Sequence, residues 1–358
     1  MNLLTRSKIK PLEFCNKVTA SSHTLKAIEE LLKGFELMQR TPSDVRQLNR
    51  FITTVTDLVT GPSSSLDIKI ASAAIEEMSR AFTMFAPYRD VRKVSIFGSA
   101  RTTPDSPIYA LTAATAKALA DHHFMVVTGA GPGIMEAGMV GAGRENSIGV
   151  SIRLPFESGA NSVIAGDDKY VSMRYFFTRK LMLVKESHAF LCMPGGFGTL
   201  DETFELLTLA QTAKSVPVPI VFLEVPGQPF WTPLMKVLEP LLLDHGLISE
   251  SDISLYTITD NIDDAVNEIT RFYANYDSIR FVDDILYIRM QRAVPDVQFR
   301  EIASRFASLA FDGAIEQTSA TPAEIKDNDV PDLPRVCLKY AAKGFADLRG
   351  LIDALNQF

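Results

Sequence analysis

Residues 189–202, with the sequence AFLCMPGGFGTLDE, decide the fold class of this chain. They open with an apolar run, 189–193, that is typical of a strand buried on both faces of a parallel sheet. Pro194 and a cluster of glycines follow, and the sequence then predicts a helix over 199–213. A buried strand, a glycine-rich turn and a helix in this order predict one unit of a doubly wound α/β sheet.

Further apolar runs on both sides of this stretch indicate the remaining strands. We predict strands at 94–97, 124–127, 148–152, 219–223 and 255–258. The segments between the runs are long enough for crossover helices. We predict these helices at 107–121, 133–146, 175–187, 199–213, 231–245 and 262–276. The alternation predicts an α/β fold with a doubly wound, Rossmann-like parallel sheet over residues 91–277.

The segment before the sheet, residues 1–90, reads as helical. Apolar residues recur at helical spacing over 25–35, 45–58 and 70–85, and the sequence GPSSS at 61–65 interrupts this pattern. Apolar stripes of this kind usually form packing surfaces, and we assign them no chemistry.

The segment after the sheet, residues 278–358, predicts a small α+β extension. Its pattern indicates a strand at 285–290, helices at 297–309 and 335–355, and a polar connection at 312–332. We therefore expect three parts in the chain: a helical segment (1–90), a sheet domain (91–277) and an α+β extension (278–358).

The composition argues against several classes of protein. The 358 residues are 46% hydrophobic and 22% charged, as in globular proteins. The net charge of −7 and the lack of a long basic run argue against a polynucleotide partner. No apolar run reaches the about 18 residues of a membrane span, and the first residues contain no apolar signal-peptide core. We expect a cytoplasmic protein without membrane attachment, and leave a transit peptide open.

The cysteine and histidine residues indicate neither a disulfide framework nor a metal site. The three cysteines lie far apart in the sequence, and the five histidines show no metal-ligand spacing. We therefore expect no metal.

Three glycine-rich stretches follow predicted strands, at 97–101, 128–133 and 193–199. Ligands of open parallel sheets bind beyond the carboxyl ends of the strands, where these stretches should meet. Glycine lets a backbone approach a ligand closely, and the start of a helix favours a phosphate. Together the three stretches predict a site for an anionic ligand.

Two common nucleotide motifs do not account for these stretches. The P-loop pattern GxxxxGK[ST] is absent, which argues against an ATPase of that type. Gly129 and Gly131 begin a dinucleotide fingerprint, but Ile134 occupies its last glycine position. The predicted strand at 148–152 continues to Arg153 and not to an acidic residue, so a nicotinamide-dependent dehydrogenase is also disfavoured.

Two readings remain open for Glu202 from the residues alone. Thr199 and Glu202 have the spacing of a capping box, with Thr199 as the N-cap, and the spacing by itself favours that reading. In the other reading Glu202 faces the ligand, and Glu205 shares its face of the helix. Asp201 points about 100° away from Glu202, and we expect it to be solvated.

Arg179 and Lys180 also allow two readings. Such a pair usually lies on a solvated helix face, but its positively charged side chains can also point into a ligand cleft. Residues 176–184 are otherwise largely apolar and leave little polar surface, which makes a basic pair unusual here.

Several of these stretches resemble motifs of the Lonely Guy (LOG) family. Residues 194–202 look like its PGGxGTxxE motif, and residues 173–180 resemble its second motif, which ends in Arg-Lys. Residues 129–137 are similar to the glycine-rich turn of the long-chain branch, as are residues 154–157 followed by Asn161.

This resemblance implies a function and a set of roles. LOG proteins are phosphoribohydrolases, which release the free base from a cytokinin riboside 5′-monophosphate. The resemblance implies hydrolysis of the N-glycosidic bond of a nucleoside 5′-monophosphate, with Arg179 and Glu202 as catalytic residues. It implies no metal or redox cofactor, and at least a homodimer, because a neighbouring subunit completes LOG sites. Many members carry the label "lysine decarboxylase", which we do not follow.

The remaining candidate site residues have binding roles. We expect the N–H groups of the 195–199 turn to bind phosphate, and Glu205 to bind ribose hydroxyls or water. Glu136 has an alternative reading as a charge in the first turn of a helix. The full set of substrate- or phosphate-binding candidates is Gly195, Gly196, Gly198, Thr199, Glu205, Ser99, Arg101, Gly131, Gly133, Glu136 and Lys180.

The chain also departs from short LOG proteins. These have Met-His where this chain has Phe176-Phe177, and they lack its long segments before and after the sheet domain. Both departures place the chain nearer the long branch and leave the base open. The alternatives to a hydrolase are a non-catalytic carrier of a nucleotide or of the molybdenum cofactor, and a regulatory binder of a signalling nucleotide.

Overall fold

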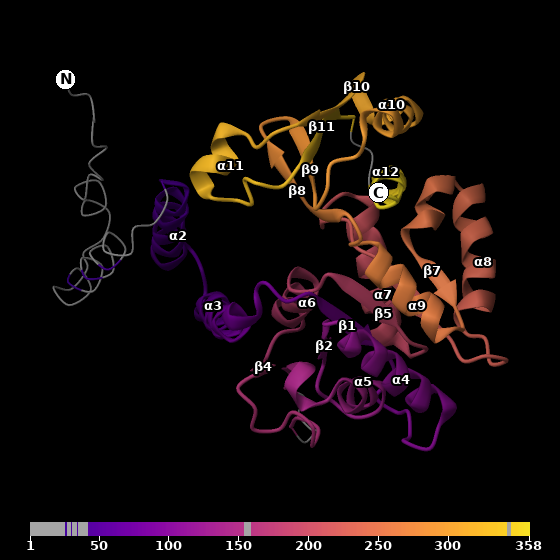
Figure 1. Ribbon diagram of the computed structural model, residues 1–358. Helices are drawn as coiled ribbons and strands as arrows, with labels where there is room; N and C mark the ends of the chain where they lie inside the picture. Colours follow the sequence, from indigo (N-terminus) through magenta and orange to yellow (C-terminus); the bar gives the residue numbers. More distant parts are fainter. Residues whose placement is uncertain (1–25, 27–29, 31–33, 35–41, 154–158, 342–344) are drawn as a thin grey trace. The chain divides into compact units, whose positions relative to one another are not determined.

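The computed structural model describes residues 42–153, 159–341 and 345–358, together with Lys26, Glu30 and Gly34 (Figure 1). The chain divides into two compact units, residues 1–73 and 74–358, which are described separately. The division into 1–90, 91–277 and 278–358 stays a prediction.

The first unit contains helix α2 (Pro42–Thr60) and the first turns of α3 (Ser65–Phe85). Ser64 caps α3, because its hydroxyl accepts a hydrogen bond from the Asp67 N–H at 3.2 Å while the Asp67 carboxylate accepts one from the Ser64 N–H. The helices predicted over 45–58 and 70–85 are confirmed. The apolar residues of the helix expected over 25–35 lie outside the described residues.

The second unit is built on a sheet of seven parallel strands in the order β4-β3-β2-β1-β5-β6-β7. The strands are β1 (Lys93–Phe97), β2 (Met125–Thr128), β3 (Ser147–Ile152), β4 (Tyr170–Met173), β5 (Ala189–Cys192), β6 (Ile220–Leu223) and β7 (Thr257–Thr259). Each of the six predicted strands overlaps one of these, and the doubly wound fold is confirmed. Strand β4 was not predicted, because buried and half-buried residues alternate in it and no continuous apolar run marks it.

Helices cover both faces of this sheet. They are α4 (Pro107–Asp121), α5 (Ile134–Ala142), α6 (Phe176–Lys185), α7 (Phe197–Gln211), α8 (Trp231–Asp244) and α9 (Ile262–Arg271). On one face Val94 and Ile96 of β1 pack with residues of α4, α5 and α9. On the other face Phe97 packs with residues of α3, α6, α7 and α8. Burial on both faces explains why the strands are apolar throughout.

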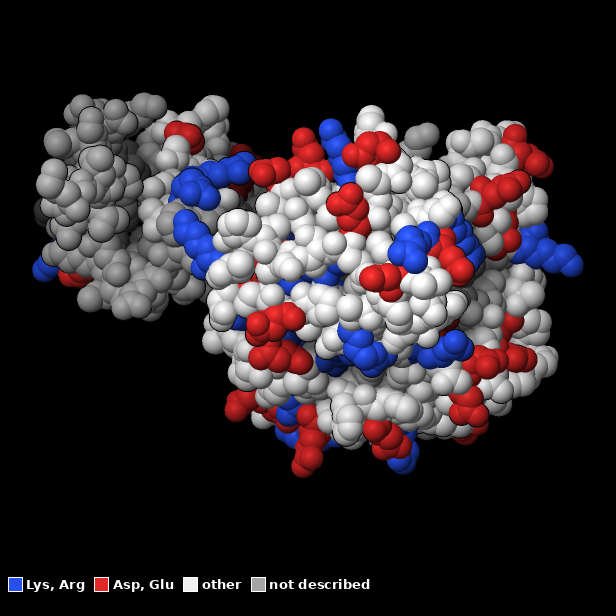
Figure 2. Space-filling model, turned by 45° about the horizontal axis from the view of Figure 1, so that its top comes forward, with Lys and Arg blue, Asp and Glu red and all other residues white. Residues whose placement is uncertain are grey.

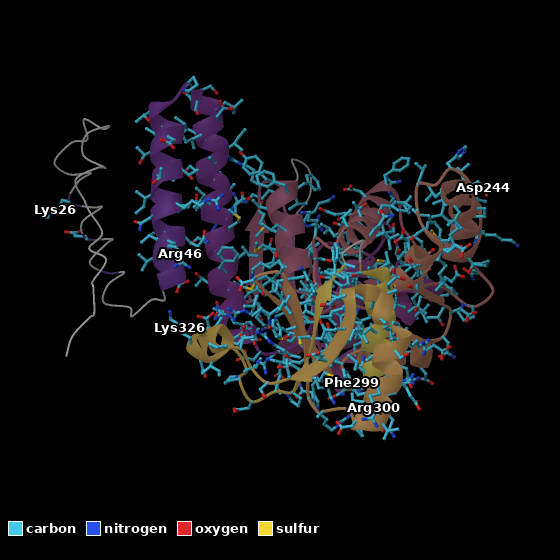
Figure 3. All side chains as sticks on the ribbon, turned by 90° about the horizontal axis from the view of Figure 1, so that it is seen from above. Lys26, Arg46, Asp244, Phe299, Arg300 and Lys326 are labelled. Carbon is cyan, nitrogen blue, oxygen red and sulfur yellow. The ribbon has the colours of Figure 1, made fainter. Side chains whose placement is uncertain are left out.

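The C-terminal part forms a second, antiparallel sheet in the order β10-β11-β9-β8. Its elements are β8 (Tyr276–Val282), β9 (Ile285–Met290), α10 (Asp296–Arg305), β10 (Ala310–Thr318), α11 (Pro322–Asp327), β11 (Arg335–Tyr340) and α12 (Ala346–Leu355). In α10, Phe299 is buried and the adjacent Arg300 is exposed, which shows the two faces of the helix (Figure 3).

Three expectations for this part and for the helix that precedes it were wrong. The predicted helix 335–355 begins with strand β11, whose Val336 and Leu338 are buried in strand alternation, and only α12 is helical. The polar connection 312–332 contains most of β10 and all of α11. Its strand was not predicted because β10 is an edge strand with mostly exposed side chains. The helix predicted to reach residue 276 ends at Arg271, and β8 begins at Tyr276.

The surface agrees with the composition. Figure 2 shows Lys and Arg side chains interspersed with Asp and Glu side chains on the face in view, in agreement with the lack of a long basic run in the sequence. Among the described residues, no helix is both long and apolar enough to cross a membrane.

Candidate active site

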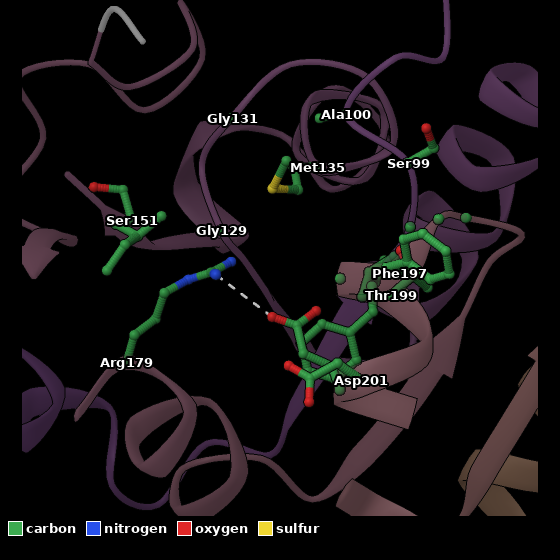
Figure 4. A pocket seen from close by; sticks show the side chains of 18 of the residues that line it. Ser99, Ala100, Gly129, Gly131, Met135, Ser151, Arg179, Phe197, Thr199 and Asp201 are labelled. Carbon is green, nitrogen blue, oxygen red and sulfur yellow. Dashed lines mark ion pairs between the residues drawn. The ribbon is translucent and has the colours of Figure 1, made fainter. Parts of the chain in front are cut away.

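A cleft of about 1100 Å³ lies at the carboxyl ends of the parallel strands (Figure 4). The turns after β1, β2, β3 and β5 line it. Strand β1 is the switch point of the sheet, because β2 to β4 follow on one side of it and β5 to β7 on the other. Ligands of doubly wound sheets bind at such a point.

The start of α7 opens into this cleft. The helix begins at Phe197 with Gly196 as its N-cap, and no side chain caps it. Its first backbone bond joins the Leu200 N–H to the Gly196 carbonyl at 3.0 Å. The N–H groups that precede it, including those of Gly198 and Thr199, have no partner within the helix. This end of the helix carries the positive part of the helix dipole.

The capping-box reading of Thr199 and Glu202 is wrong. Thr199 lies inside the first turn of α7, 5% exposed, instead of at the N-cap. A Cβ atom on Gly195 would lie 2.1 Å from the Thr199 hydroxyl oxygen, so Thr199 packs against a residue that must be glycine. The Glu202 side chain is therefore free to make a different contact.

That contact is an ion pair with Arg179. Nη1 of Arg179, from α6, lies 3.4 Å from Oε1 of Glu202, from α7 (dashed line in Figure 4). Nε of Arg179 donates to the Val150 carbonyl of β3 at 3.1 Å, and the residue is 9% exposed. A Cβ atom on Gly129 would lie 2.4 Å from Nη2, so this glycine makes room for the guanidinium. Arg179 therefore does not lie on a solvated helix face.

The surroundings of Glu202 change its acidity. Burial raises the pKa of its carboxyl, and the positive charges of Arg179 and Lys180 act in the opposite direction. The pKa remains above the ordinary value for glutamic acid. A raised pKa that results from burial next to a specific charge partner, in a cleft, is typical of a functional carboxylate.

Lys180 lines the cleft but is bound to two carboxylates of α7. Its Nζ lies 2.7 Å from Oδ2 of Asp201 and 3.0 Å from Oε2 of Glu205. Asp201, expected to be solvated, is 63% exposed in its side chain and forms this salt bridge. Glu205 does not line the cleft with Glu202. It lines a neighbouring cavity of about 950 Å³.

The other candidates fall into two groups. Residues that line the cleft together with Arg179 and Glu202 are Ser99, Arg101, Gly131, Gly195, Gly196, Gly198, Thr199 and Lys180. Gly133 and Glu136 do not line it. Gly133 is the N-cap of α5 with φ +71°, and Glu136 lies in the first turn of α5, as its alternative reading expected.

The sequence did not reveal the cleft wall formed by β3 and β4. Ser151 Oγ and Tyr170 Oη lie 2.7 Å apart there, and Arg153 Nε donates to Ser172 Oγ at 3.3 Å. All four residues line the cleft. Strand β4 was not predicted. The one sequence signal for this wall was the alternation of Tyr170 and Ser172 with the apolar residues Val171 and Met173.

A resident metal has no evident ligands here. The described residues contain no group of three or more His, Cys, Asp or Glu side chains that could hold a metal ion.

The comparisons with known proteins agree with the sequence motifs. The family described as "Possible lysine decarboxylase" matches residues 132–269. The "Probable cytokinin riboside 5'-monophosphate phosphoribohydrolase LOG4" of Oryza sativa subsp. japonica is 26% identical over 186 residues, which cover 50% of this chain and 77% of that protein. The "Cytokinin riboside 5'-monophosphate phosphoribohydrolase LOG7" of Arabidopsis thaliana is 28% identical over 101 residues. That match covers 28% of this chain and 45% of LOG7, which is less than half of the relative's length.

Among solved structures, one match of low similarity is a carrier protein. The molybdenum cofactor carrier protein from Chlamydomonas reinhardtii is 19% identical, with a TM-score of 0.34, over 49% of this chain and 94% of that one. The family match, over residues 132–269, includes both Arg179 and Glu202. The chain is thus similar to this family and, more distantly, to the two plant LOG proteins.

Proposed function

We propose that this protein hydrolyses the N-glycosidic bond of a nucleoside 5′-monophosphate and releases the free base and ribose 5-phosphate. The observation that carries the proposal is the pairing of Arg179 with Glu202, at 3.4 Å, in the cleft onto which the uncapped start of α7 opens. A carboxylate, a fixed cation and a phosphate-binding turn are the groups that this reaction needs.

The phosphate belongs at the start of α7. A Cβ atom added to Gly196 or Gly198 would meet nothing within 4 Å, so packing does not require glycine at these positions. Both residues line the cleft, where a side chain would occupy space next to the free N–H groups. Glycine there leaves the helix end open to a phosphate, and the helix dipole favours its charge.

Glu202 acts on the ribose in this proposal. As the bond from C1′ to the base nitrogen breaks, positive charge develops on the sugar. The ionised Glu202 carboxylate stabilises that charge or orients the water whose oxygen forms the new bond to C1′, and the leaving base takes up a proton. Arg179 holds the substrate next to Glu202 and favours the ionised carboxylate.

The plant relatives support this reaction class. Both are named as phosphoribohydrolases of cytokinin riboside 5′-monophosphate, and the identities of 26% and 28% leave the base that this chain prefers to experiment. The β3–β4 wall of the cleft is polar, with Ser151, Arg153 and Tyr170, and another side is apolar, with Phe230 and Leu234. Either side could contact the base and select it.

Lysine decarboxylation, the activity in the family description, does not suit the lysine of this cleft. A pyridoxal-phosphate enzyme needs a lysine amine that can lose its proton and bind the cofactor covalently. Burial of Lys180 favours that loss, but the hydrogen bonds to Asp201 and Glu205 outweigh it and raise the pKa of Lys180. The amine therefore stays protonated and bound to α7.

The test is turnover of a panel of monophosphates: AMP, GMP, CMP, UMP and isopentenyladenosine monophosphate. Released base and ribose 5-phosphate are measured for the wild type, for Glu202→Ala and for Glu301→Gln, which changes an exposed glutamate of α10. We expect turnover in the wild type and the control, and a loss of about 10²-fold or more in Glu202→Ala. Binding without turnover of any member would instead favour a nucleotide carrier.

A further inference from the structure

A buried carboxylate in α3 faces the helix that carries Arg179. Glu77 lies on the apolar stripe of α3, together with Ala74, Ala81 and Phe85, and is 3% exposed. A carboxylate in such a place is unfavourable unless hydrogen bonds compensate for the lost water. These residues of α3 belong to the second unit, as the sheet does.

The Glu77 carboxylate forms its hydrogen bonds with residues at the start of α6. Oε1 accepts from the Arg174 N–H at 2.7 Å, and Oε2 accepts from the Tyr175 N–H at 3.4 Å and lies 2.8 Å from the Thr178 hydroxyl. Tyr175 is the N-cap of α6 and its side chain makes no capping bond. Glu77 therefore acts as the cap, from a helix about a hundred positions earlier in the sequence. The helix dipole of α6 also stabilises a negative charge at this end of the helix.

The capped residues support Arg179 directly. The Arg179 N–H donates to the Tyr175 carbonyl at 3.2 Å, and Thr178, fully buried, is its neighbour in the chain. The guanidinium then reaches Val150 and Glu202 from this fixed turn. A shift at the start of α6 would move the guanidinium away from Glu202, and small displacements of catalytic groups have large effects on rate.

We propose that Glu77 is a positioning residue, whose carboxylate fixes the start of α6 and thereby holds Arg179 against Glu202. This gives a role to the leading segment that distinguishes the chain from short LOG proteins, since α3 lies within residues 1–90. The kinetic part of the proposal rests on the proposed function.

The first test needs no substrate. Hydrogen exchange of the peptide containing residues 174–179 is compared among the wild type, Glu77→Gln and Glu76→Gln, the last changing an exposed neighbour on α3. We expect several-fold faster exchange in Glu77→Gln only. Unchanged exchange in Glu77→Gln would overturn the proposal, whatever the reaction of the protein proves to be.

The second test asks whether Glu77 acts through Arg179. We expect Glu77→Gln to lower kcat/KM by about tenfold or more, mainly through kcat, with Glu76→Gln unchanged. In an Arg179→Ala background the same change should have little further effect. Equal losses in both backgrounds, or wild-type kinetics in Glu77→Gln, would overturn the proposal.

A second pair of variants covers the case in which Glu77→Gln does not fold. Thr178→Val removes one hydrogen bond to Glu77 with little change of shape, and Thr178→Ser keeps it. We expect a loss of kcat/KM in the first variant and rescue in the second, and equal rates in the two would overturn the proposal. If the wild type turns over no monophosphate, the proposed function fails, and the exchange measurement alone decides the role of Glu77.

Discussion

Glu202 experiences two opposing influences at the scale of the residue. Burial favours its neutral form, and the guanidinium of Arg179 favours its ionised form. In the proposed reaction this carboxylate is charged, and its ionisation then depends on Arg179 as well as on pH. The Arg179 side chain cannot turn away easily, because Val150 holds its Nε and Gly129 leaves it just enough room.

This balance predicts the pH dependence of the reaction. Because the pKa of Glu202 is raised and the proposed reaction uses its ionised form, kcat/KM should fall in acid at a pH above the ordinary pKa of glutamic acid. Arg179→Gln removes the cation that lowers this pKa, so the acid limb should move to still higher pH, in addition to the loss of rate. A profile of kcat/KM against pH for both proteins measures this. An acid limb that stays in place in Arg179→Gln would contradict the role of the ion pair.

The sequence motifs predicted most of the residues that line the cleft, but the roles of single residues were misjudged. Thr199 was open to a capping role because Glu202 follows it by three positions, yet α7 starts two residues before Thr199. Glu77 was overlooked because its helix was read as a packing surface. A charged residue within the apolar stripe 74–77–81–85 was the available indication, since such a residue needs a buried partner. The partner itself lies about a hundred positions away, and spacing carries no information on it.

At the scale of the elements, the C-terminal sheet depends on one buried ionic cluster. Glu324 of α11 is fully buried between Arg289 of β9 and Arg335 of β11, at 2.9 and 3.1 Å. Burial of Glu324 raises its pKa, but the bonds from Thr321, Arg289 and Arg335 outweigh this and lower the pKa to about 2. The cluster ties a short helix to the two central strands of the sheet.

We expect Glu324→Gln to destabilise the protein by about 3–5 kcal/mol, because the buried Arg335 loses its carboxylate partner and Arg289 keeps Asp329. Asp327→Asn, a change on the same helix at a more exposed salt bridge, should cost about 0–1 kcal/mol. In the wild type the stabilisation is complete above the unfolded pKa of about 4.3 and is lost as the pH falls towards 2. Urea unfolding of the three proteins at neutral and acid pH measures these differences. Similar effects of the two substitutions would show that the cluster contributes no more than a surface pair.

Two of the strands that sequence analysis missed share a physical cause. Strands β4 and β10 lie at sheet edges and have half-buried or exposed side chains, so no apolar run marks them. Strand β11 is central and buried, but it is followed closely by the apolar residues of α12, and the two were read as one helix. The inner strands of the parallel sheet were predictable because burial on both faces left them apolar.

At the scale of the whole molecule, α6 leaves an apolar surface uncovered beside the cleft. Phe176, Phe177 and Leu181 are 54%, 55% and 47% exposed, and Phe176 lines both the cleft and the neighbouring cavity. Apolar side chains that gather around a binding site indicate an interaction surface. A homodimer is also what the sequence analysis expected, and we propose that a second copy covers this surface.

This proposal predicts the state of the protein in solution. Sedimentation velocity at micromolar concentration should show a dimer or larger oligomer for the wild type, and a monomer for Leu181→Asp, because a buried charge without a partner opposes association. Val237→Asp places the same charge at an exposed apolar position of α8, 67% exposed, and should remain associated. A monomeric wild type would contradict the proposal. If the monomeric variant keeps full turnover, the second copy covers the surface of α6 without completing the cleft; if turnover falls with association, the second copy supplies part of the site.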